Sequence, residues 1–335
     1  MNDPSAFYAG KLAVVTGAGG FIDSHLVEAL VRRGARVRAL VRYTSSSGRG
    51  HLDRLPPDVL REVEVVLGTV EDGVMVRKLV RSADAVFHLA ALIGIPYSYV
   101  APHQYVATNV VGTLNVLEAV RELGVGRMVH TSTSETYGTA RYTPIDEAHP
   151  LQGQSPYAAS KIGADKLAES YFLSFGTPVA TIRPFNTYGP RQSSRAFIPS
   201  VMKQLAAGRT SIRVGSTSPR RDLNFVEDTV AGFLAVGASE RALGQTLNVG
   251  SGRTISMGDL AELIFQVSGK PARLETDETR VRPGNSEVEL LLADYGRAKD
   301  LVGYAPRVSL EEGLRRTWEY VLQNLADYRP DEYAI

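Results

Sequence analysis

Short runs of aliphatic and β-branched residues alternate with longer amphipathic segments through the first half of the chain. The runs are apolar throughout rather than at every second position, which indicates strands covered on both faces, as in a parallel sheet. Strands are predicted at 11–16, 36–41, 63–68, 85–90, 127–132 and 179–184, and helices at 20–33, about 100–123 and about 156–175. This alternation is typical of right-handed βαβ units, so we expect an α/β fold with a Rossmann-type, doubly wound parallel sheet.

The pattern changes after about residue 185, where Pro- and Gly-rich pieces such as "RPFNTYGPRQ" and "VGSTSPRRD" mix with short helices. We expect residues 1–185 to form mainly a dinucleotide-binding domain. Residues 186–335 are expected to form mainly a smaller, mixed α/β lobe, with the chain returning to the first domain at about 222–250. Two serine-capped amphipathic helices are predicted in this half, at 256–269 and 309–325.

The composition excludes several classes of function. The 37 Lys and Arg residues balance 36 Asp and Glu residues, so the charge pattern of a nucleic-acid-binding or membrane-surface protein is missing. The chain has no cysteine, which excludes disulfides and thiolate chemistry. We see neither a signal peptide nor an apolar run of the roughly 20 residues that a membrane helix needs, and therefore expect a cytoplasmic protein.

A glycine cluster, Gly17, Gly19 and Gly20, lies between the first strand and the first helix. Glycines there allow the backbone to approach a diphosphate, which the helix N-terminus then holds through its free N–H groups. The third glycine of the usual spacing is replaced by Asp23. A carboxylate about 6 Å from a phosphate repels it by roughly 3 kcal/mol at an effective dielectric near 20. We expect Asp23 to point into solvent, or the helix to be slightly displaced.

The end of the second strand favours NADP over NAD. An NAD site usually has an acid there to hold the ribose 2′-hydroxyl, but no acid occurs between Glu28 and Asp53. Instead Arg42 is followed by Thr44 and three serines, which suits a 2′-phosphate.

Tyr157 and Lys161 stand four residues apart on a predicted helix and therefore share a face. A lysine beside a phenol favours the ionised phenol, so we expect Lys161 to lower the pKa of Tyr157 and make it a base. Thr133 adds a hydroxyl at the end of the fifth strand, where open α/β sheets bind ligands. No histidine and carboxylate spacing indicates a metal site.

These residues belong to a longer series of motifs: "TGAGGF", "FHLAA", "NVVGTLNVLEA", "TSTSETYG", "YAASK", "RPFNTYGPR", "RRDLNFVEDT" and "RPGNSEV". In this order the series resembles the extended short-chain dehydrogenase/reductases that act on nucleotide sugars, over residues 11–325. Within that family it is most similar to the NDP-hexose 4,6-dehydratases of the GDP-mannose and GDP-N-acetylglucosamine types.

The resemblance implies a catalytic role for each residue of this group. Tyr157 takes the proton of the sugar 4-hydroxyl while hydride leaves C4, Lys161 holds Tyr157 and the nicotinamide ribose, and Thr133 bonds the 4-oxygen. Glu135 is then the base that removes the C5 proton. Ser134 occupies the position at which the glucose-type enzymes have an aspartic acid, so Glu135 must itself protonate the leaving 6-hydroxyl, assisted by Ser134. The product would be a 4-keto-6-deoxy sugar.

The resemblance also implies the binding residues. It implies homodimerisation through the helices at 100–123 and 156–175. Cofactor contacts are expected from Gly17, Gly19, Gly20, Phe21, Ile22, Arg42, Ala90, Asn109, Tyr157, Lys161 and Pro184. Substrate contacts are expected from Asn186, Arg191, Arg221 and Arg282.

Other activities on the same scaffold remain open. A 4-epimerase needs Tyr157, Lys161 and Thr133 but no C5 base, and a UDP-glucuronate decarboxylase carries a similar Thr-Ser-Glu sequence. A non-catalytic dinucleotide sensor would be consistent with Asp23 but would not need the complete catalytic group. The mass of the product separates water loss, carbon dioxide loss and epimerisation.

Overall fold

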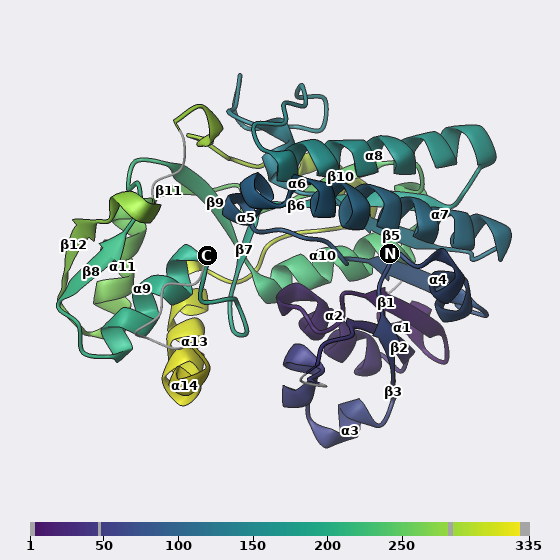
Figure 1. Cartoon of the computed structure of the whole chain (residues 1–335), viewed down its shortest axis with the longest axis horizontal. Coiled ribbons are helices and arrows are strands. Elements are labelled where there is room, and N and C mark those ends of the chain that lie inside the picture. The colour runs from purple at the N-terminus through teal and green to yellow at the C-terminus, as the bar shows by residue number, and fades with distance from the viewer. Residues whose placement is uncertain (1–3, 46–47, 281–283, 329–335) are drawn as a thin grey trace.

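The computed structural model describes residues 4–45, 48–280 and 284–328. Its centre is a seven-stranded parallel sheet with the strand order β10-β6-β5-β4-β1-β2-β3 (Figure 1). The strands are β1 (Leu12–Thr16), β2 (Arg36–Arg42), β3 (Val63–Gly68), β4 (Ala85–His88), β5 (Met128–Thr131), β6 (Val179–Pro184) and β10 (Thr246–Val249). The expected Rossmann-type fold class is confirmed. The sheet also contains β10, a strand that the sequence pattern did not predict.

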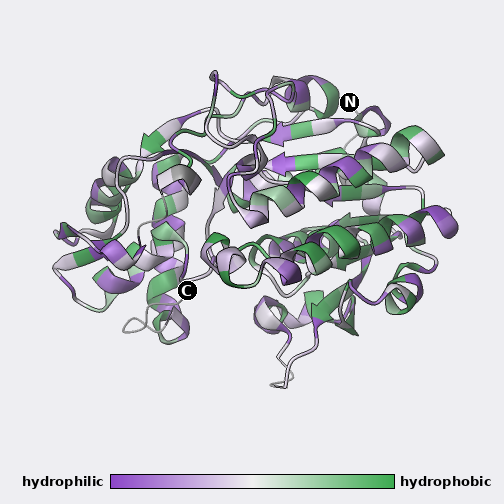
Figure 2. Cartoon of the chain, turned by 45° about the horizontal axis from the view of Figure 1, so that its top comes forward, coloured by the Kyte–Doolittle hydropathy of each residue, from purple (hydrophilic) through white to green (hydrophobic). Residues whose placement is uncertain are grey.

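Helices cover both faces of this sheet. Helices α2 (Phe21–Val31) and α10 (Val226–Ala238) pack on one face, and α4 (Gly73–Val80), α7 (Gly112–Glu122) and α8 (Pro156–Phe175) pack on the other. Alternate residues of one strand enter the two cores: Val15 packs with α2 and α10, whereas Val14 packs with α4 and α7. The covering helices carry mixed apolar and polar residues (Figure 2), because each has one face against the sheet.

The helix expected at about 100–123 consists of three consecutive pieces. They are α6 (Pro102–Tyr105), a π-helical segment η2 (Val106–Val111) and α7. A π-helical turn adds residues to a turn and rotates the side chains that follow, which simple 3.6-residue periodicity does not reveal. The buried Asn109 lies in this segment.

The second half forms two small sheets with their own helices. Strands β7 (Asn186–Tyr188), β9 (Arg220–Phe225) and β11 (Thr254–Ser256) form one sheet, and β8 (Ser211–Val214) pairs in parallel with β12 (Arg273–Thr276). The two predicted serine caps are confirmed, because Ser256 and Ser309 each accept a backbone N–H three residues later. The helices here are α9 (Phe197–Ala206), α11 (Met257–Ser268), α12 (Gly296–Val302), α13 (Leu310–Gln323) and α14 (Leu325–Tyr328).

The remaining elements are short. No helix in the described ranges is long and apolar enough to cross a membrane. The short elements are α1 (Pro4–Tyr8), η1 (Gly50–Arg54), α3 (Pro57–Leu60), α5 (Ile95–Val100), η3 (Ser134–Tyr137), η4 (Glu240–Ala242), η5 (Glu278–Arg280) and η6 (Gly284–Ser286).

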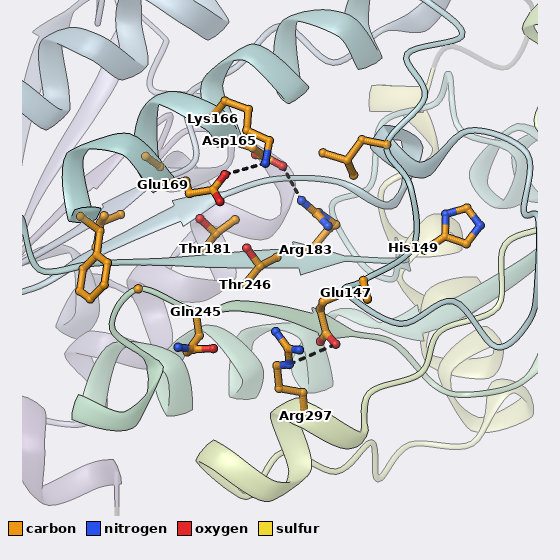
Figure 3. A pocket seen from close by; sticks show the side chains of 16 residues that line it. Glu147, His149, Asp165, Lys166, Glu169, Thr181, Arg183, Gln245, Thr246 and Arg297 are labelled. Atoms are coloured by element: carbon orange, nitrogen blue, oxygen red, sulfur yellow. Dashed lines mark hydrogen bonds and ion pairs between the residues drawn. The ribbon is translucent and has the colours of Figure 1, made fainter. Parts of the chain in front are cut away.

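A buried ion pair joins α8 to the sheet. Asp165 of α8 receives a hydrogen bond from Arg183 of β6 at 2.7 Å and another from Ser132, just beyond β5, at 2.6 Å. The same carboxylate lies 3.0 Å from Nε2 of His130 on β5. Arg183 also donates to the hydroxyl of Tyr137 at 2.7 Å. Asp165 and Arg183 line a pocket of about 360 Å³ and point toward each other in Figure 3.

Charge pairing outweighs burial at Asp165. Burial alone raises the pKa of a carboxyl group, but Arg183 and His130 hold the pKa of Asp165 well below its ordinary value. The carboxylate is therefore ionised throughout the neutral range. Because both partners are buried, removing one leaves the other as an uncompensated charge.

We predict that Asp165→Asn lowers the free energy of unfolding by about 3 kcal/mol or more, since it leaves the Arg183 guanidinium buried without its counter-ion. Urea denaturation at pH 7 measures the loss. Asp58→Asn is the matched control: Asp58 pairs with Arg32 at the surface, and its substitution should leave the free energy of unfolding nearly unchanged. Equal effects of the two substitutions would contradict the structural role of the pair.

Candidate active site

The glycine loop turns tightly between β1 and α2. Gly17 has φ +77°, and a Cβ atom there would lie 2.9 Å from the backbone of Ala90. The loop is closed by a 2.8 Å hydrogen bond from Gly20 N to Gly17 O, and α2 begins at Phe21 with Ile22 next in its first turn. The absence of a side chain at Gly17 brings the loop backbone close to the loop that follows β4.

A cavity lies beside this loop at the carboxyl ends of the strands. It has a volume of about 120 Å³, and its walls include Gly17, Arg42 and Ala90. A neighbouring pocket of about 390 Å³ shares Arg42 and continues over Gly68 and Glu71. This is the edge at which open parallel sheets bind ligands. The second sequence-predicted glycine, Gly19, instead packs against the start of η1: a Cβ atom there would lie 2.9 Å from the carbonyl oxygen of Arg49, and its own carbonyl accepts a 3.0 Å hydrogen bond from the backbone N–H of His51.

Asp23 points inward, so the expected solvent-facing orientation is wrong. The carboxyl group lies under the glycine loop, where Cβ atoms built on Gly20 and Gly17 would be 2.4 Å and 3.0 Å from its oxygens. Its Oδ1 atom is buried and has no hydrogen-bond partner among the described residues. Burial raises the pKa of Asp23 to about 7, against a smaller opposing effect of its own backbone N–H.

Tyr157, Thr133 and Lys161 meet where β5 ends and α8 begins. Tyr157 lies in the first turn of α8, 7% exposed, and its hydroxyl is hydrogen-bonded to Thr133. Thr133 caps η3 by accepting the N–H of Glu135 at 3.3 Å. Lys161, one turn along α8, is buried, and its Nζ donates to the carbonyl oxygen of Thr131 at 2.6 Å.

The expected effect of Lys161 on Tyr157 is not found. Burial raises the pKa of Tyr157, and the nearby Glu135 carboxylate raises it further, although the hydrogen bond with Thr133 acts in the opposite direction. Lys161 is instead held by the backbone of Thr131. Burial lowers the pKa of Lys161 to about 8, while Asp165 acts to raise it. Tyr157 is therefore a neutral phenol at neutral pH.

Glu135 and Ser134 differ in accessibility. Glu135 is half-buried in η3, close enough to Tyr157 for its charge to act on the phenol. The neighbouring Ser134 is only 2% exposed. Of these two residues, Glu135 is thus the one that can reach a ligand without a rearrangement of η3.

Two other predicted cofactor residues hold the surrounding backbone. Asn109 is fully buried; its side-chain oxygen accepts the N–H of Leu92, and its amide donates to the Leu92 carbonyl and to Ser160 of α8. It thereby fixes the loop after β4 to α8. Pro184 ends β6, opposite Val249 of β10.

A separate pocket of about 350 Å³ opens in the second half of the chain, beyond the end of β6. Asn186 and Arg221 line it, as do Gln192, Arg195 and Arg280. The side-chain oxygens of Asn186 and Gln192 are buried and lack hydrogen-bond partners among the described residues. A ligand with hydroxyl or N–H donors would satisfy both oxygens.

The predicted arginines have different positions. Arg221 is buried, and its guanidinium donates to Glu287 at 2.8 Å. Arg191, with φ +69°, turns away from this pocket and pairs with Glu28 of α2 at 2.9 Å. Arg282 lies outside the described residues. The sequence reasoning missed Arg280, two residues earlier in the same arginine-rich segment, and assigned no role to Arg195.

The arrangement fits a nicotinamide dinucleotide, with one exception. The lack of a side chain at Gly17 lets the loop backbone approach Ala90, and the adjoining cavities, together called the dinucleotide groove, follow the strand ends. The inward carboxyl group of Asp23 is the exception. Within the described ranges, no three His, Asp or Glu side chains are grouped to hold a metal ion.

Comparison with known proteins identifies the family. The sequence profile of GDP-mannose 4,6 dehydratase matches residues 14–317. A dTDP-glucose 4,6-dehydratase of Streptomyces antibioticus is 34% identical over 322 residues, which cover 95% of this chain and 94% of the relative. A UDP-glucose 4-epimerase of Mycolicibacterium smegmatis is 34% identical over 312 residues, covering 92% and 97%.

The solved structures agree with the sequence relatives. The crystal structure of a dTDP-glucose 4,6-dehydratase of Streptomyces venezuelae, with NAD bound, has a TM-score of 0.85 at 29% identity and covers 95% of this chain and 99% of that one. Both the sequence motifs and the fold therefore place this chain among the extended short-chain dehydrogenase/reductases, in the family of nucleotide-sugar dehydratases and epimerases.

Proposed function

We propose that the protein is a nucleotide-sugar 4,6-dehydratase that converts an NDP-hexose into an NDP-4-keto-6-deoxyhexose. The observation that carries this proposal is the position of Glu135, a half-buried carboxylate next to the Tyr157–Thr133 pair. Epimerisation at C4 requires a base at the 4-hydroxyl alone. A second base is needed only if a neighbouring carbon also loses a proton.

The nicotinamide dinucleotide, when bound, supplies the hydride acceptor for C4 and the hydride donor for C6. Tyr157 first gives up its phenol proton to water and then, as the phenolate, removes the proton of the 4-hydroxyl, while its hydrogen-bond partner Thr133 orients the 4-oxygen. The resulting 4-ketone acidifies the C5 proton, which Glu135 removes. Glu135 then passes this proton to the 6-hydroxyl, so that one water leaves across C5 and C6. Solvent supplies the proton that C5 regains when C6 accepts the hydride.

Binding of the substrate is assigned to the pocket beyond β6. Its unpaired Asn186 and Gln192 oxygens suit the donors of a sugar or base. Its arginines suit a diphosphate, whose oxygens match the planar guanidinium group. We assign the contacts with the diphosphate to Arg221 and Arg280 because both arginines line this pocket.

We expect Glu135→Gln to lower the rate of water elimination by about 10²-fold or more, because the amide cannot accept the C5 proton. The assay is incubation with a panel of UDP-, GDP-, dTDP- and CDP-hexoses in deuterated water, followed by mass spectrometry. The wild-type product should have lost one water and carry deuterium at C5.

Glu169→Gln serves as the control, because Glu169 is an exposed carboxylate on the outer surface of α8; it should keep the full rate. Full turnover by Glu135→Gln would refute the role of this residue. A wild-type product of unchanged mass with inverted C4 would instead support a 4-epimerase, the activity of the Mycolicibacterium smegmatis relative.

We further propose NADP as the preferred cofactor. Arg42 is exposed at the end of β2 and lines both cavities of the dinucleotide groove, and the first acid after it, Asp53, is bonded to Arg49. A guanidinium at this position suits the 2′-phosphate of the adenosine ribose.

Arg42→Ala should weaken NADP⁺ binding about tenfold or more and leave NAD⁺ binding nearly unchanged, as measured by calorimetric titration. Arg36→Ala, at the opposite end of the same strand, is the control, since Arg36 is equally exposed but remote from the groove. Tighter binding of NAD⁺ than NADP⁺ by the wild type would contradict the assignment.

We also propose a homodimer formed through the helices on the α8 face. Large apolar side chains are exposed there: Val106 by 51%, Val111 by 43% and Leu173 by 73%. Figure 1 shows α7 and α8 side by side on one face of the sheet. Exposed apolar side chains grouped on neighbouring helices are typical of a protein interface.

The doubly substituted variant Val106→Asp/Val111→Asp should be monomeric by light scattering, whereas the wild type should have twice the chain mass. Leu322→Asp, an exposed leucine of α13, should stay dimeric. A monomeric wild type would overturn this proposal.

A further inference from the structure

Asp23 is the feature that the proposed function leaves unexplained. It occupies the first turn of α2, where helix N–H groups and the helix dipole favour an anion, and where a dinucleotide diphosphate would sit. The side chain is half-buried, and its Oδ1 atom is buried under the glycine loop instead of facing water. The inference below rests on the dinucleotide part of the proposed function.

The Oδ1 atom of Asp23 indicates that a hydrogen-bond partner is missing at this position. Oδ1 is buried without a partner among the described residues, at 3.0 Å from a Cβ built on Gly17. A buried carboxyl oxygen without a hydrogen bond is costly, more so when it is charged. A protonated carboxyl group is both less costly to bury and able to donate a hydrogen bond to a phosphate oxygen.

Two acids near Asp23 form ion pairs, and two neighbouring histidines are neutral. Glu28 pairs with Arg191, and Asp53 pairs with Arg49. Burial lowers the pKa of both His25 and His51 to about 4, so these rings are neutral above pH 6. Further charged groups lie on the elements around α2. They are His25 and Glu28 on α2 itself, Arg36, Arg38 and Arg42 on β2, Arg49, His51, Asp53 and Arg54 in or beside η1, Arg191 after β7, and Glu227 and Asp228 on α10.

We propose that the dinucleotide binds only when the Asp23 carboxyl group carries a proton, so that one proton is taken up with the diphosphate whenever Asp23 is ionised in the free protein. The diphosphate is fully charged above pH 6 and would face a second negative charge if Asp23 were ionised. The proton removes that charge and turns Oδ1 or Oδ2 into a donor. Asp23 is thus a cofactor-binding residue whose contribution to the affinity for the dinucleotide depends on pH.

The test is calorimetric titration of the full-length protein with NAD⁺ between pH 6.0 and 8.5, in two buffers of different ionisation enthalpy. NAD⁺ is the probe because the 2′-phosphate of NADP⁺ itself titrates near pH 6. For the wild type we expect proton uptake close to zero at pH 6 and close to one at pH 8.5. The affinity should fall by up to about tenfold per pH unit above pH 7.

Asp23→Asn keeps the shape but cannot ionise, so its affinity should be independent of pH and its proton uptake zero. Asp23→Gly should show the same pH independence and bind NAD⁺ at least about tenfold more tightly than the wild type at pH 8.5. Asp259→Asn is the matched control: Asp259 is an exposed first-turn aspartate of α11, and the wild-type pH dependence should persist.

Two results would overturn the inference: a pH-independent wild-type affinity, or proton uptake by Asp23→Asn equal to that of the wild type. Failure of every variant to bind either NAD⁺ or NADP⁺ at any pH would instead refute the dinucleotide site itself. Because no sugar is present in the titration, neither result depends on whether the enzyme is a dehydratase or an epimerase.

Discussion

The buried pair of Asp165 and Arg183 holds the proposed catalytic residues in one place. Helix α8 carries Tyr157 and Lys161, whereas Thr133 and Glu135 follow β5, and nothing in the covalent chain fixes these segments to each other. The carboxylate of Asp165 bonds the hydroxyl of Ser132, immediately before Thr133, while Arg183 extends the same network to Tyr137 at the end of η3. The ion pair that stabilises the core therefore also fixes the position of Tyr157 and Lys161 relative to Thr133 and Glu135.

Much of the fold could be predicted because buried parallel strands have a distinctive pattern. Six continuous apolar runs predicted six of the seven strands of the sheet. Strand β10 was missed, since its four residues, "TLNV", are too short and too mixed to stand out. The three-residue strands β7 and β11 gave no signal either, because pairing across the lobe determines them rather than their own residues.

The residue types of the candidate site could be predicted, but the directions in which their side chains point could not. The motifs indicated Tyr157, Lys161 and Glu135, which do lie around the junction of β5 and α8. The orientation of Arg191 could not be foreseen, because a single left-handed backbone conformation turns it toward Glu28. Similarly, no sequence pattern shows that Lys161 bonds the carbonyl of Thr131 or that Asp23 folds under the glycine loop.

The position of β10 has a consequence for how the chain can be divided. Its four residues pair along β6, although about sixty residues, among them the strands β7, β8 and β9 of the other lobe, intervene between the two strands. Cutting the chain after the sixth strand would uncover the backbone of a buried apolar edge, a surface that promotes aggregation. The two lobes are therefore not separable folding units, and a fragment ending near residue 185 is a poor choice for expression.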